Sequence, residues 1–515
     1  MEDRMHTVHF FWRNMKYYKA VVFLLFTLFI GIGCSTSIGE VQVDTVPVDT
    51  VPVDMVPGDA APVEAAQVIE PKVEQVAMDM AGTWEGLLKI QPGVEMKLLF
   101  NIEKTNDGYT AVLAIPQQGV TGLPVQTATL SETGEVDLVI ASIGARFTGT
   151  MQGHDATVSI EGVFEQSGFK FPLVLSPSLQ SAPTGKPQDP VPPYPYISEE
   201  VEFVQQPDGF TLAGTITRPK ATGKYPAVVL VTGSGSQDRD EAIMGHRPFL
   251  VLSDALTKAG IVVLRYDDRG FAQSKGDASA ATTMDFAMDA ASAVSYLASQ
   301  PYVDKSRIGV LGHSEGGVIA PIVASDNPEV DFIILMAGTG VNGIELLKDQ
   351  SAAILRTQGA PEAYINQITA LNESIYRMII EPSADMEDQK RKVAEKLTSI
   401  GVGPDEVKAQ IAALFSPWYR YFLMLDPAVY LEKTTVPVLI LNGSKDTQVT
   451  SALNVPAIEA ALQRGGNMQS TTIVYDGLNH LFQPAQTGAV AEYATIETTI
   501  EPQVLNDIAT WILQR

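Results

Sequence analysis

The sequence contains a single cysteine, Cys34, and only six histidines among its 515 residues. One cysteine cannot form a disulfide within the chain, and it excludes the cysteine clusters that hold structural zinc or iron–sulfur groups. So few histidines also argue against a histidine-rich metal site. We therefore expect no metal centre.

Basic residues are scarce as well. The chain has 35 Lys and Arg residues but 60 Asp and Glu residues, which gives a formal net charge of -25. A chain this acidic repels phosphate backbones, so we expect no nucleic-acid partner. Apolar residues make up 45% of the chain, and its length suits two or three folded domains.

The N-terminal region has the pattern of an export signal. An uncharged apolar stretch from Ala20 to Ile32 follows three basic residues, and at thirteen residues it is too short to span a bilayer easily. The Gly-Ile-Gly-Cys-Ser sequence that ends it resembles a bacterial lipobox, which implies cleavage before Cys34 and a lipid anchor on it. Alternatively, Cys34 is an ordinary residue that ends an N-terminal anchor helix. Both interpretations tether the rest of the chain to a membrane, outside the cytoplasm. A serine directly after the lipidated cysteine, as at Ser35, resembles the pattern of lipoproteins on the periplasmic side of a bacterial outer membrane.

Two proline-rich stretches divide the chain. The first contains repeats of Val-Pro-Val-Asp, which cannot close a core, and the second runs from Pro177 to Tyr196. We expect a signal peptide (1–33), a tether (34–79), a small β-domain (80–176), a linker (177–197) and a larger domain (198–515).

The β-domain is predicted from a period-two pattern between Gly82 and Leu175, interrupted by turn sequences such as Asn106-Asp107-Gly108. This pattern is typical of a small antiparallel barrel or sandwich. Its one histidine, His154, is expected in a solvated turn. Nothing in this segment identifies a ligand.

After Tyr196 the pattern changes to continuous apolar runs separated by segments of helical period. Such alternation predicts an α/β fold with a mostly parallel central sheet and helices on both faces. A ligand site is then expected beyond the carboxyl ends of the strands. The runs cover 227–233, 261–267, 307–314, 331–338, 437–443 and 471–477.

The third run ends in Gly-His-Ser-Glu-Gly-Gly (312–317) and leads into a predicted helix. A strand, a tight turn and a helix around Gly-x-Ser-x-Gly form a nucleophile elbow, which exposes Ser314 Oγ above the sheet. The alternative is that Ser314 is an ordinary helix N-cap.

Ser314 requires a base, and His480 is the one histidine that follows it in the sequence. His480 lies in a loop after the last run, where it can reach back over the sheet. We expect His313 to point away from Ser314 and to pack in the core, and we consider His246 a weaker site candidate.

The acid that orients the imidazole should follow the preceding strand, which indicates Asp446. Asp476 is the competing candidate, but it lies only four residues before His480.

The oxyanion is expected to bind to two backbone N–H groups, those of Glu315 and Ser234. Ser234 belongs to a Gly-Ser-Gly loop after the first run, where glycines let the backbone approach a substrate. The alternative is that these glycines only form a strand-to-helix turn.

An insertion at about 339–425 is helical in pattern and ends in an aromatic group. We interpret it as a cap that supplies an apolar acyl or alcohol pocket. Alternatively, the aromatic residues simply pack the cap onto the core. They are Phe415, Trp418, Tyr419, Tyr421 and Phe422.

Together, residues from about 80 to 515 resemble bacterial α/β-hydrolase esterases related to the serine aminopeptidase and dienelactone hydrolase groups. The matching motifs are GSGSQDRDE (233–241), RYDDRG (265–270), GHSEGG (312–317), GSKDTQV (443–449) and LNHLFQ (478–483). The resemblance implies ester hydrolysis through an acyl-enzyme, without metal or organic cofactor, and a small β-domain ahead of the catalytic one. One departure is Gln273, where such proteins usually have glycine.

The sequence thus predicts a carboxylesterase-type serine hydrolase that cleaves small-molecule esters of short to medium acyl chains. The alternatives are a peptidase or an acyl-thioesterase on the same triad, or a catalytically inert surface binding protein.

Overall fold

The computed structural model describes residues 79–515, apart from eight short gaps at 92–93, 106–107, 116–119, 141–142, 154–157, 167–168, 179–185 and 383–384. The expected signal peptide, Cys34, almost all of the expected tether and His154 lie outside the described residues. No described helix combines the length and apolar character needed to cross a membrane.

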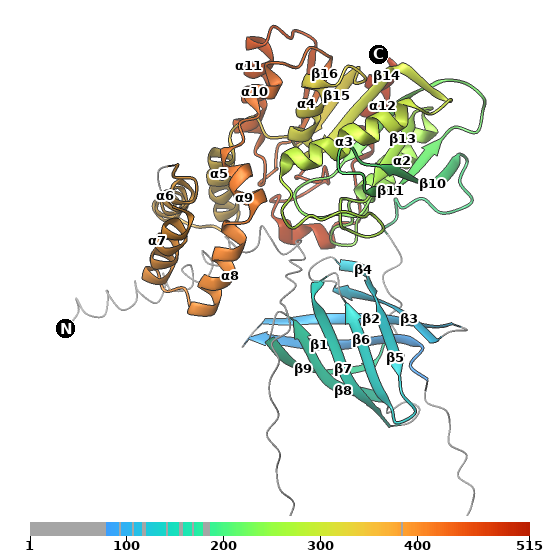
Figure 1. The fold of residues 1–515 in the computed structure, drawn as a ribbon, viewed down its shortest axis with the longest axis vertical. Helices are drawn as coiled ribbons and strands as arrows, with labels where there is room; N and C mark the ends of the chain where they lie inside the picture. The colour runs from blue at the N-terminus through green and yellow to red at the C-terminus, as the bar shows by residue number, and fades with distance from the viewer. Residues whose placement is uncertain are drawn as a thin grey trace, which may run out of the picture.

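The first domain is an antiparallel, barrel-like sheet (Figure 1). Apolar side chains at alternate positions, such as Leu98, Phe100 and Phe147, fill its interior. The two strands at the ends of the sheet order follow each other in the chain. Within the described residues the strands run in the order β4-β3-β2-β1-β9-β8-β7-β6-β5. Their bounds are β1 (Gly82–Gln91), β2 (Val94–Thr105), β3 (Gly108–Ile115), β4 (Val120–Val125), β5 (Thr127–Leu130), β6 (Glu135–Ile140), β7 (Ala145–Gln152), β8 (Ser159–Gln166) and β9 (Phe169–Pro177).

The second domain contains an eight-stranded sheet among the described residues, in the order β10-β11-β13-β12-β14-β15-β16-β17. β11 pairs antiparallel with both of its neighbours, β10 and β13. From β13 to β17 in this order, neighbouring strands are parallel. The chain passes from β12 to β13 on one side and then returns to β14 on the other side of β12. At such a switch in strand order, a crevice is expected at the carboxyl ends of the two strands, here β12 and β14. The bounds are β10 (Ile197–Val204), β11 (Thr211–Arg218), β12 (Tyr225–Val231), β13 (Val262–Tyr266), β14 (Val303–His313), β15 (Phe332–Met336), β16 (Val438–Gly443) and β17 (Ser470–Tyr475).

Helices cover both faces of this sheet, because the residues of its inner strands are apolar and buried on both sides. In β12, Val229 and Val231 pack in one core with the first helix group, and Val228 and Leu230 pack in another core with the second group. The first group is α3 (Thr283–Ala298), α4 (Gly316–Asp326), α10 (Ala428–Leu431) and α11 (Ser451–Arg464); the second is α2 (Pro248–Lys258) and α12 (Pro502–Leu513). A short 3-10 helix, η4 (Val490–Thr495), precedes α12.

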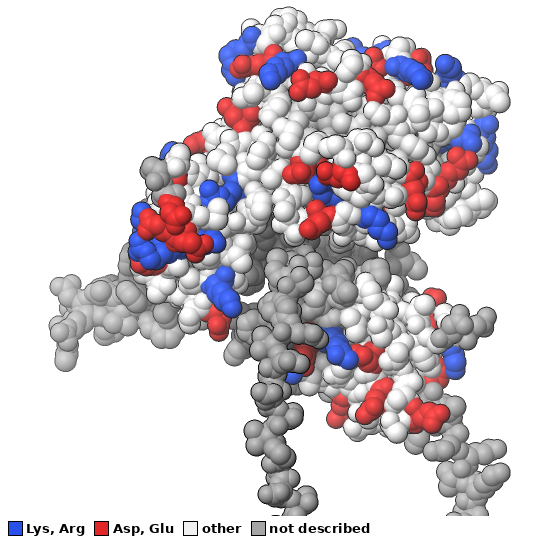
Figure 2. Space-filling model, in the orientation of Figure 1, with Lys and Arg blue, Asp and Glu red and all other residues white. Residues whose placement is uncertain are grey.

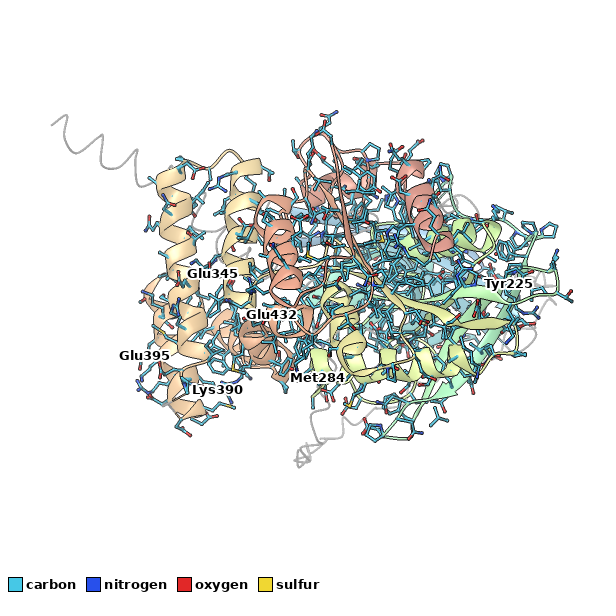
Figure 3. All side chains as sticks on the ribbon, turned by 90° about the horizontal axis from the view of Figure 1, so that it is seen from above. Tyr225, Met284, Glu345, Lys390, Glu395 and Glu432 are labelled. Carbon is cyan, nitrogen blue, oxygen red and sulfur yellow. The ribbon has the colours of Figure 1, made fainter. Side chains whose placement is uncertain are left out.

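The insertion between β15 and β16 is helical and has a core of its own. Seen from above, its helices stand beside the α/β domain, with Glu345, Lys390 and Glu395 on them (Figure 3). Acidic and basic side chains are interspersed on the face in Figure 2, with a dense mixed group over α7. The helices are α5 (Gly343–Thr357), α6 (Glu362–Ile379), α7 (Met386–Ser399), α8 (Pro404–Leu414) and α9 (Pro417–Met424).

The second half of the expected linker is packed against the α/β domain. Lys186 Nζ donates hydrogen bonds to the carbonyl oxygens of Ala494 and Ile496, at 3.1 and 2.6 Å. Asp189 forms an ion pair with Arg247. Residues 186–196 therefore belong structurally to the second domain, whereas the sequence assigned them to a linker between the domains.

Candidate active site

Ser314 lies on a strained turn between β14 and α4. Its φ of 54° is in the left-handed region, which non-glycine residues rarely adopt and which costs on the order of 1–3 kcal/mol. The neighbouring glycines leave no room for a side chain, since a Cβ on Gly312 would lie 1.8 Å from Gly316 O and one on Gly316 would lie 2.2 Å from Val231 O. The N-cap of α4 is Glu315, so the interpretation of Ser314 as the N-cap is wrong.

His480 and Asp446 are brought together by the loops after β17 and β16. His480 Nδ1 lies 2.8 Å from Asp446 Oδ2, and both side chains are almost fully buried. The backbone N–H groups of Gln448 and Val449 donate to Asp446 Oδ1, so the carboxylate accepts three hydrogen bonds. The competing acid, Asp476, accepts instead from Ser444 Oγ.

The loop that carries His480 lies against the elbow. The carbonyl oxygen of His480 is 3.0 Å from Nε2 of His313, the residue before Ser314, and the two rings are 4.7 Å apart. Among the described residues, no hydrogen bond joins the His480 ring to Ser314 Oγ; its ring is bonded to Asp446. Hydrogen bonds between catalytic groups are often long before substrate binds, so this arrangement is compatible with proton transfer.

The loop after β12 passes directly over the elbow. A Cβ on Gly233 would lie 3.2 Å from Ser314 Cβ. The N–H of Gly233 donates to Glu241 Oε1, and that of Gln237 donates to Asp268 Oδ2. The Gly233 N–H is therefore already occupied, which is consistent with the expectation that Ser234 supplies the oxyanion donor from this loop.

Asp268 holds this loop in place through hydrogen bonds to two of its residues. Asp268 is buried and also accepts a hydrogen bond from Thr232 Oγ1. Burial raises the pKa of Asp268 well above its usual value, against the opposing effect of its hydrogen bonds.

The side chain of Glu315 joins the elbow to the cap. Its Oε1 accepts hydrogen bonds from Thr283 Oγ1 at 2.7 Å and from Trp418 Nε1 at 2.8 Å. Burial raises the pKa of Glu315, and the hydrogen bonds from Thr283, Trp418 and Ser234 partly offset this. The sequence indicated only a backbone role for Glu315, because the partners of its carboxylate lie on distant segments.

The aromatic group of the cap is mostly structural. Phe415, Tyr419 and Phe422 are buried in the core of the cap, and Tyr421 packs against the core of the α/β domain. Of the five aromatic residues, Trp418 donates a hydrogen bond to Glu315 of the elbow. The packing interpretation is therefore favoured for the other four.

His313 and His246 differ from expectation in detail. His313 is buried, as expected, but both of its ring nitrogens have polar partners, Glu241 and the His480 carbonyl. His246 precedes α2 and is bonded to Thr499 and to the Tyr493 carbonyl, outside the elbow. Burial lowers the pKa of His246 to about 4.

The departure at Gln273 is accommodated without a left-handed backbone at that position. The positive φ falls on Ala272 instead, at 47°. Gln273 donates its N–H to Asp267 and accepts from Arg239. Within the described part of the chain, no group of three or more His, Cys, Asp or Glu side chains is arranged to hold a metal ion.

Comparison with known proteins found relatives among both curated sequences and solved structures. Esterase EstD of Thermotoga maritima is 28% identical over 306 residues, which are 59% of this chain and 66% of EstD. A polyketide transferase of Penicillium crustosum is 30% identical over 145 residues, 26% of this chain and 42% of that protein. The chain thus spans less than two thirds of the length of these curated relatives. Among solved structures, an esterase of Pyrococcus furiosus aligns over 65% of this chain and 99% of its own, with 17% identity and a TM-score of 0.39.

One family also matches over a long segment. The family described as X-Pro dipeptidyl-peptidase (S15 family) matches residues 208–468, just over half of the chain, and this segment includes Ser314 and Asp446. The chain belongs to this family, the X-Pro dipeptidyl-peptidase (S15) family.

Proposed function

We propose that this chain hydrolyses carboxylic esters with short to medium acyl chains, through an acyl-enzyme on Ser314. The observation that carries the proposal is the strained turn at Ser314 beside a loop that holds His480 against Asp446. A strained backbone of this kind persists only where the surrounding structure enforces it, and it is common at catalytic sites.

His480 acts as the general base. It takes the proton of Ser314 Oγ while the oxygen attacks the ester carbonyl, and it then protonates the leaving alcohol. Water attacks the resulting acyl-enzyme by the same route, with His480 again as base. Asp446 holds the imidazole in the tautomer that has Nδ1 protonated, and it stabilises the imidazolium that forms at each step.

The negative charge of the tetrahedral intermediate is stabilised by the N–H groups of Ser234 and Glu315. Glu315 is the N-cap of α4, so the partial positive charge at this helix end adds to the effect. The interactions of Gly233, Gln237 and Thr232 with buried carboxylates fix the loop in advance.

The test is to replace Ser314 by alanine and to measure hydrolysis of p-nitrophenyl acetate and butyrate. We expect turnover to fall to background while the folded state is retained. The matched control is Ser325→Ala in α4, the helix that follows Ser314; its hydroxyl is bonded only to the Ile322 carbonyl in the described structure. Undiminished hydrolysis by Ser314→Ala would contradict the proposal.

A second candidate is a peptidase on the same triad, favoured by the family match. Ester hydrolysis is favoured by the similarity to EstD, which extends over more of the chain than the family match. A parallel assay on p-nitrophenyl esters, acyl thioesters and X-Pro p-nitroanilides separates these possibilities. We expect the highest kcat/KM on esters, whereas a preference for the anilide would establish the peptidase.

We also propose that the protein is exported and anchored to the bacterial cell envelope by lipid on Cys34, at the periplasmic side of the outer membrane. The support is the lipobox-like sequence, together with the proline-rich segment that separates it from the β-domain.

A further inference from the structure

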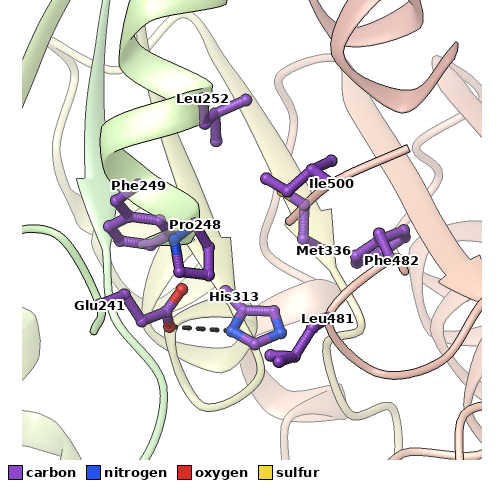
Figure 4. Close-up of a pocket in the computed structure, with 9 residues that line it drawn as sticks. All are labelled: Glu241, Pro248, Phe249, Leu252, His313, Met336, Leu481, Phe482 and Ile500. Atoms are coloured by element: carbon purple, nitrogen blue, oxygen red, sulfur yellow. Dashed lines mark hydrogen bonds and ion pairs between the residues drawn. The ribbon is translucent and has the colours of Figure 1, made fainter. Parts of the chain in front are cut away.

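Glu241 and His313 form a buried contact next to the proposed catalytic residues. Figure 4 shows Glu241, from the loop before α2, directed at the ring of His313 at the end of β14. Glu241 Oε1 lies 2.8 Å from His313 Nδ1. Their side chains are only 3% and 8% exposed, so water does not weaken the interaction as it would at a surface.

Each member of this pair also holds another segment of the site. Glu241 Oε1 accepts a hydrogen bond from the N–H of Gly233, which directly precedes Ser234 in the proposed oxyanion loop. His313 Nε2 lies 3.0 Å from the carbonyl oxygen of His480. The pair therefore connects the proposed oxyanion loop, the elbow and the histidine loop in one chain of hydrogen bonds.

The partners determine the charge state of His313. A backbone carbonyl oxygen only accepts hydrogen bonds, so Nε2 must carry a proton. While Glu241 is ionised, its carboxylate also only accepts, so Nδ1 carries a proton as well. With both nitrogens protonated, His313 is an imidazolium cation that neutralises the carboxylate of Glu241.

The surrounding charges agree with this state. Burial lowers the pKa of His313, but the charge of Glu241 and the hydrogen bonds to Glu241 and the His480 carbonyl outweigh it, and the pKa is raised overall. The ionisable groups that face His313 are Glu241, the His480 ring and Asp446, of which the two carboxylates favour the cation.

The environment offers no substitute for the pair. A cavity of about 10 Å³ beside it is lined by the two polar residues and otherwise by apolar side chains, among them Phe249, Met336 and Leu481 (Figure 4). This volume is at the lower limit for a single water molecule. If one partner is lost, the apolar cavity lining supplies no polar side chain in its place, so Glu241 keeps the bond from the Gly233 N–H and His313 keeps the bond to the His480 carbonyl.

Each of the three connected regions also contains a non-glycine residue with a left-handed backbone. These residues are Glu241 (φ 53°), Ser314 (φ 54°) and Phe482 (φ 59°). Strained conformations need surrounding interactions that over-determine them. The hydrogen bonds of Glu241 and His313 supply such interactions at the point where the three regions meet.

We propose that Glu241 and His313 are positioning residues: a buried ion pair that holds the oxyanion loop and the His480 loop in register around Ser314. This inference rests on the proposed function, because it assigns the pair to the geometry of the same reaction. The pair does not touch the reacting atoms.

The first test is Glu241→Gln, which keeps the size of the side chain and an acceptor oxygen but removes its charge. His313 then loses its counter-ion and becomes neutral, so it cannot donate from both nitrogens. We expect kcat on p-nitrophenyl butyrate to fall about 10²-fold, as for a small misplacement of catalytic groups, with KM changed less than twofold. Glu241→Asp, which restores the charge, should recover part of kcat.

The matched control is Asp289→Asn. Asp289 also forms a buried ion pair, with Arg269, and the two side chains are 2% and 5% exposed. This variant should lose comparable thermal stability but keep kcat. If Glu241→Gln loses no more kcat than this control, the pair is only structural and the positioning role is wrong.

The second test is independent of catalysis. Nitrogen-15 NMR is recorded at pH 8, which is well above the usual histidine pKa of about 6.5. It should show both ring nitrogens of His313 protonated in the wild type and only one protonated in Glu241→Gln. A neutral His313 in the wild type would overturn the ion pair. Absence of wild-type hydrolysis and of Ser314 labelling by a fluorophosphonate would instead refute the proposed function, whatever the NMR result.

Discussion

Replacing Asp446 by asparagine removes the charge beside His480 while preserving most of the local structure. Asparagine retains an acceptor oxygen for the N–H groups of Gln448 and Val449, which now bond to Asp446 Oδ1. Its amide nitrogen then faces His480 Nδ1, where the carboxylate Oδ2 lies at 2.8 Å. Two donors cannot bond to each other, so His480 changes tautomer and its imidazolium loses its counter-ion.

The magnitude follows from this distance. Opposite unit charges separated by the 2.8 Å between His480 and Asp446 attract by about 6 kcal/mol at an effective dielectric constant of about 20. Each 1.36 kcal/mol of lost transition-state stabilisation lowers the rate tenfold, so kcat should fall by about 10⁴-fold. The free energy of unfolding should decrease by only about 2 kcal/mol, since one hydrogen bond to a charged group is lost.

The assay is the initial rate of p-nitrophenyl butyrate hydrolysis at pH 8, together with urea unfolding. Asp476→Asn is the control, because Asp476 is bonded to Ser444 rather than to His480, and it should stay within twofold of the wild type. If Asp446→Asn retains activity within tenfold, or if the control variant is the inactive one, the assignment of the acid is refuted.

Three further outcomes are expected. Gly316→Ala should destabilise the fold by about 3 kcal/mol in thermal unfolding, because the added Cβ would lie 2.2 Å from Val231 O; an unchanged Tm would contradict this. The pKa of His246 is lowered to about 4, so the free energy of unfolding should fall as the pH drops from about 6.5 to 4, because only the unfolded chain binds a proton there. Urea unfolding should show that this free energy changes by at most about 1.4 kcal/mol per pH unit, and His246→Gln should reduce the change. Cys34→Ser should abolish incorporation of labelled palmitate in a bacterial host and release the protein from the membrane fraction; undiminished labelling would exclude Cys34 as the anchor.

The features that the sequence predicted well are those encoded locally. The apolar runs of the second domain correspond to strands because parallel strands buried on both faces require continuous apolar sequence. The elbow was recognisable because Gly312, Gly316 and Ser314 lie within five residues and their spacing is fixed by sterics. The antiparallel strand β10 gave no such signal, since most of its residues are at least partly exposed.

The features that the sequence did not reveal are contacts between distant segments. His313 lies 72 residues from Glu241 and 167 residues from His480, and no periodicity links them. The residue type alone suggested packing at a buried strand end. The available signal was chemical: a histidine buried there must find partners for its ring nitrogens. Docking of residues 186–196 was missed for a similar reason, because Lys186 binds backbone carbonyls that no sequence pattern marks.

The central claim is that Ser314 becomes covalently acylated during turnover. The most direct measurement is to react the folded protein with a fluorophosphonate, determine the intact mass, and locate the modified residue by peptide mass spectrometry. We expect one adduct per chain, on Ser314, and much slower labelling when His480 is replaced by glutamine. Absence of labelling in the folded, active protein, or an adduct on a different residue, would contradict the claim.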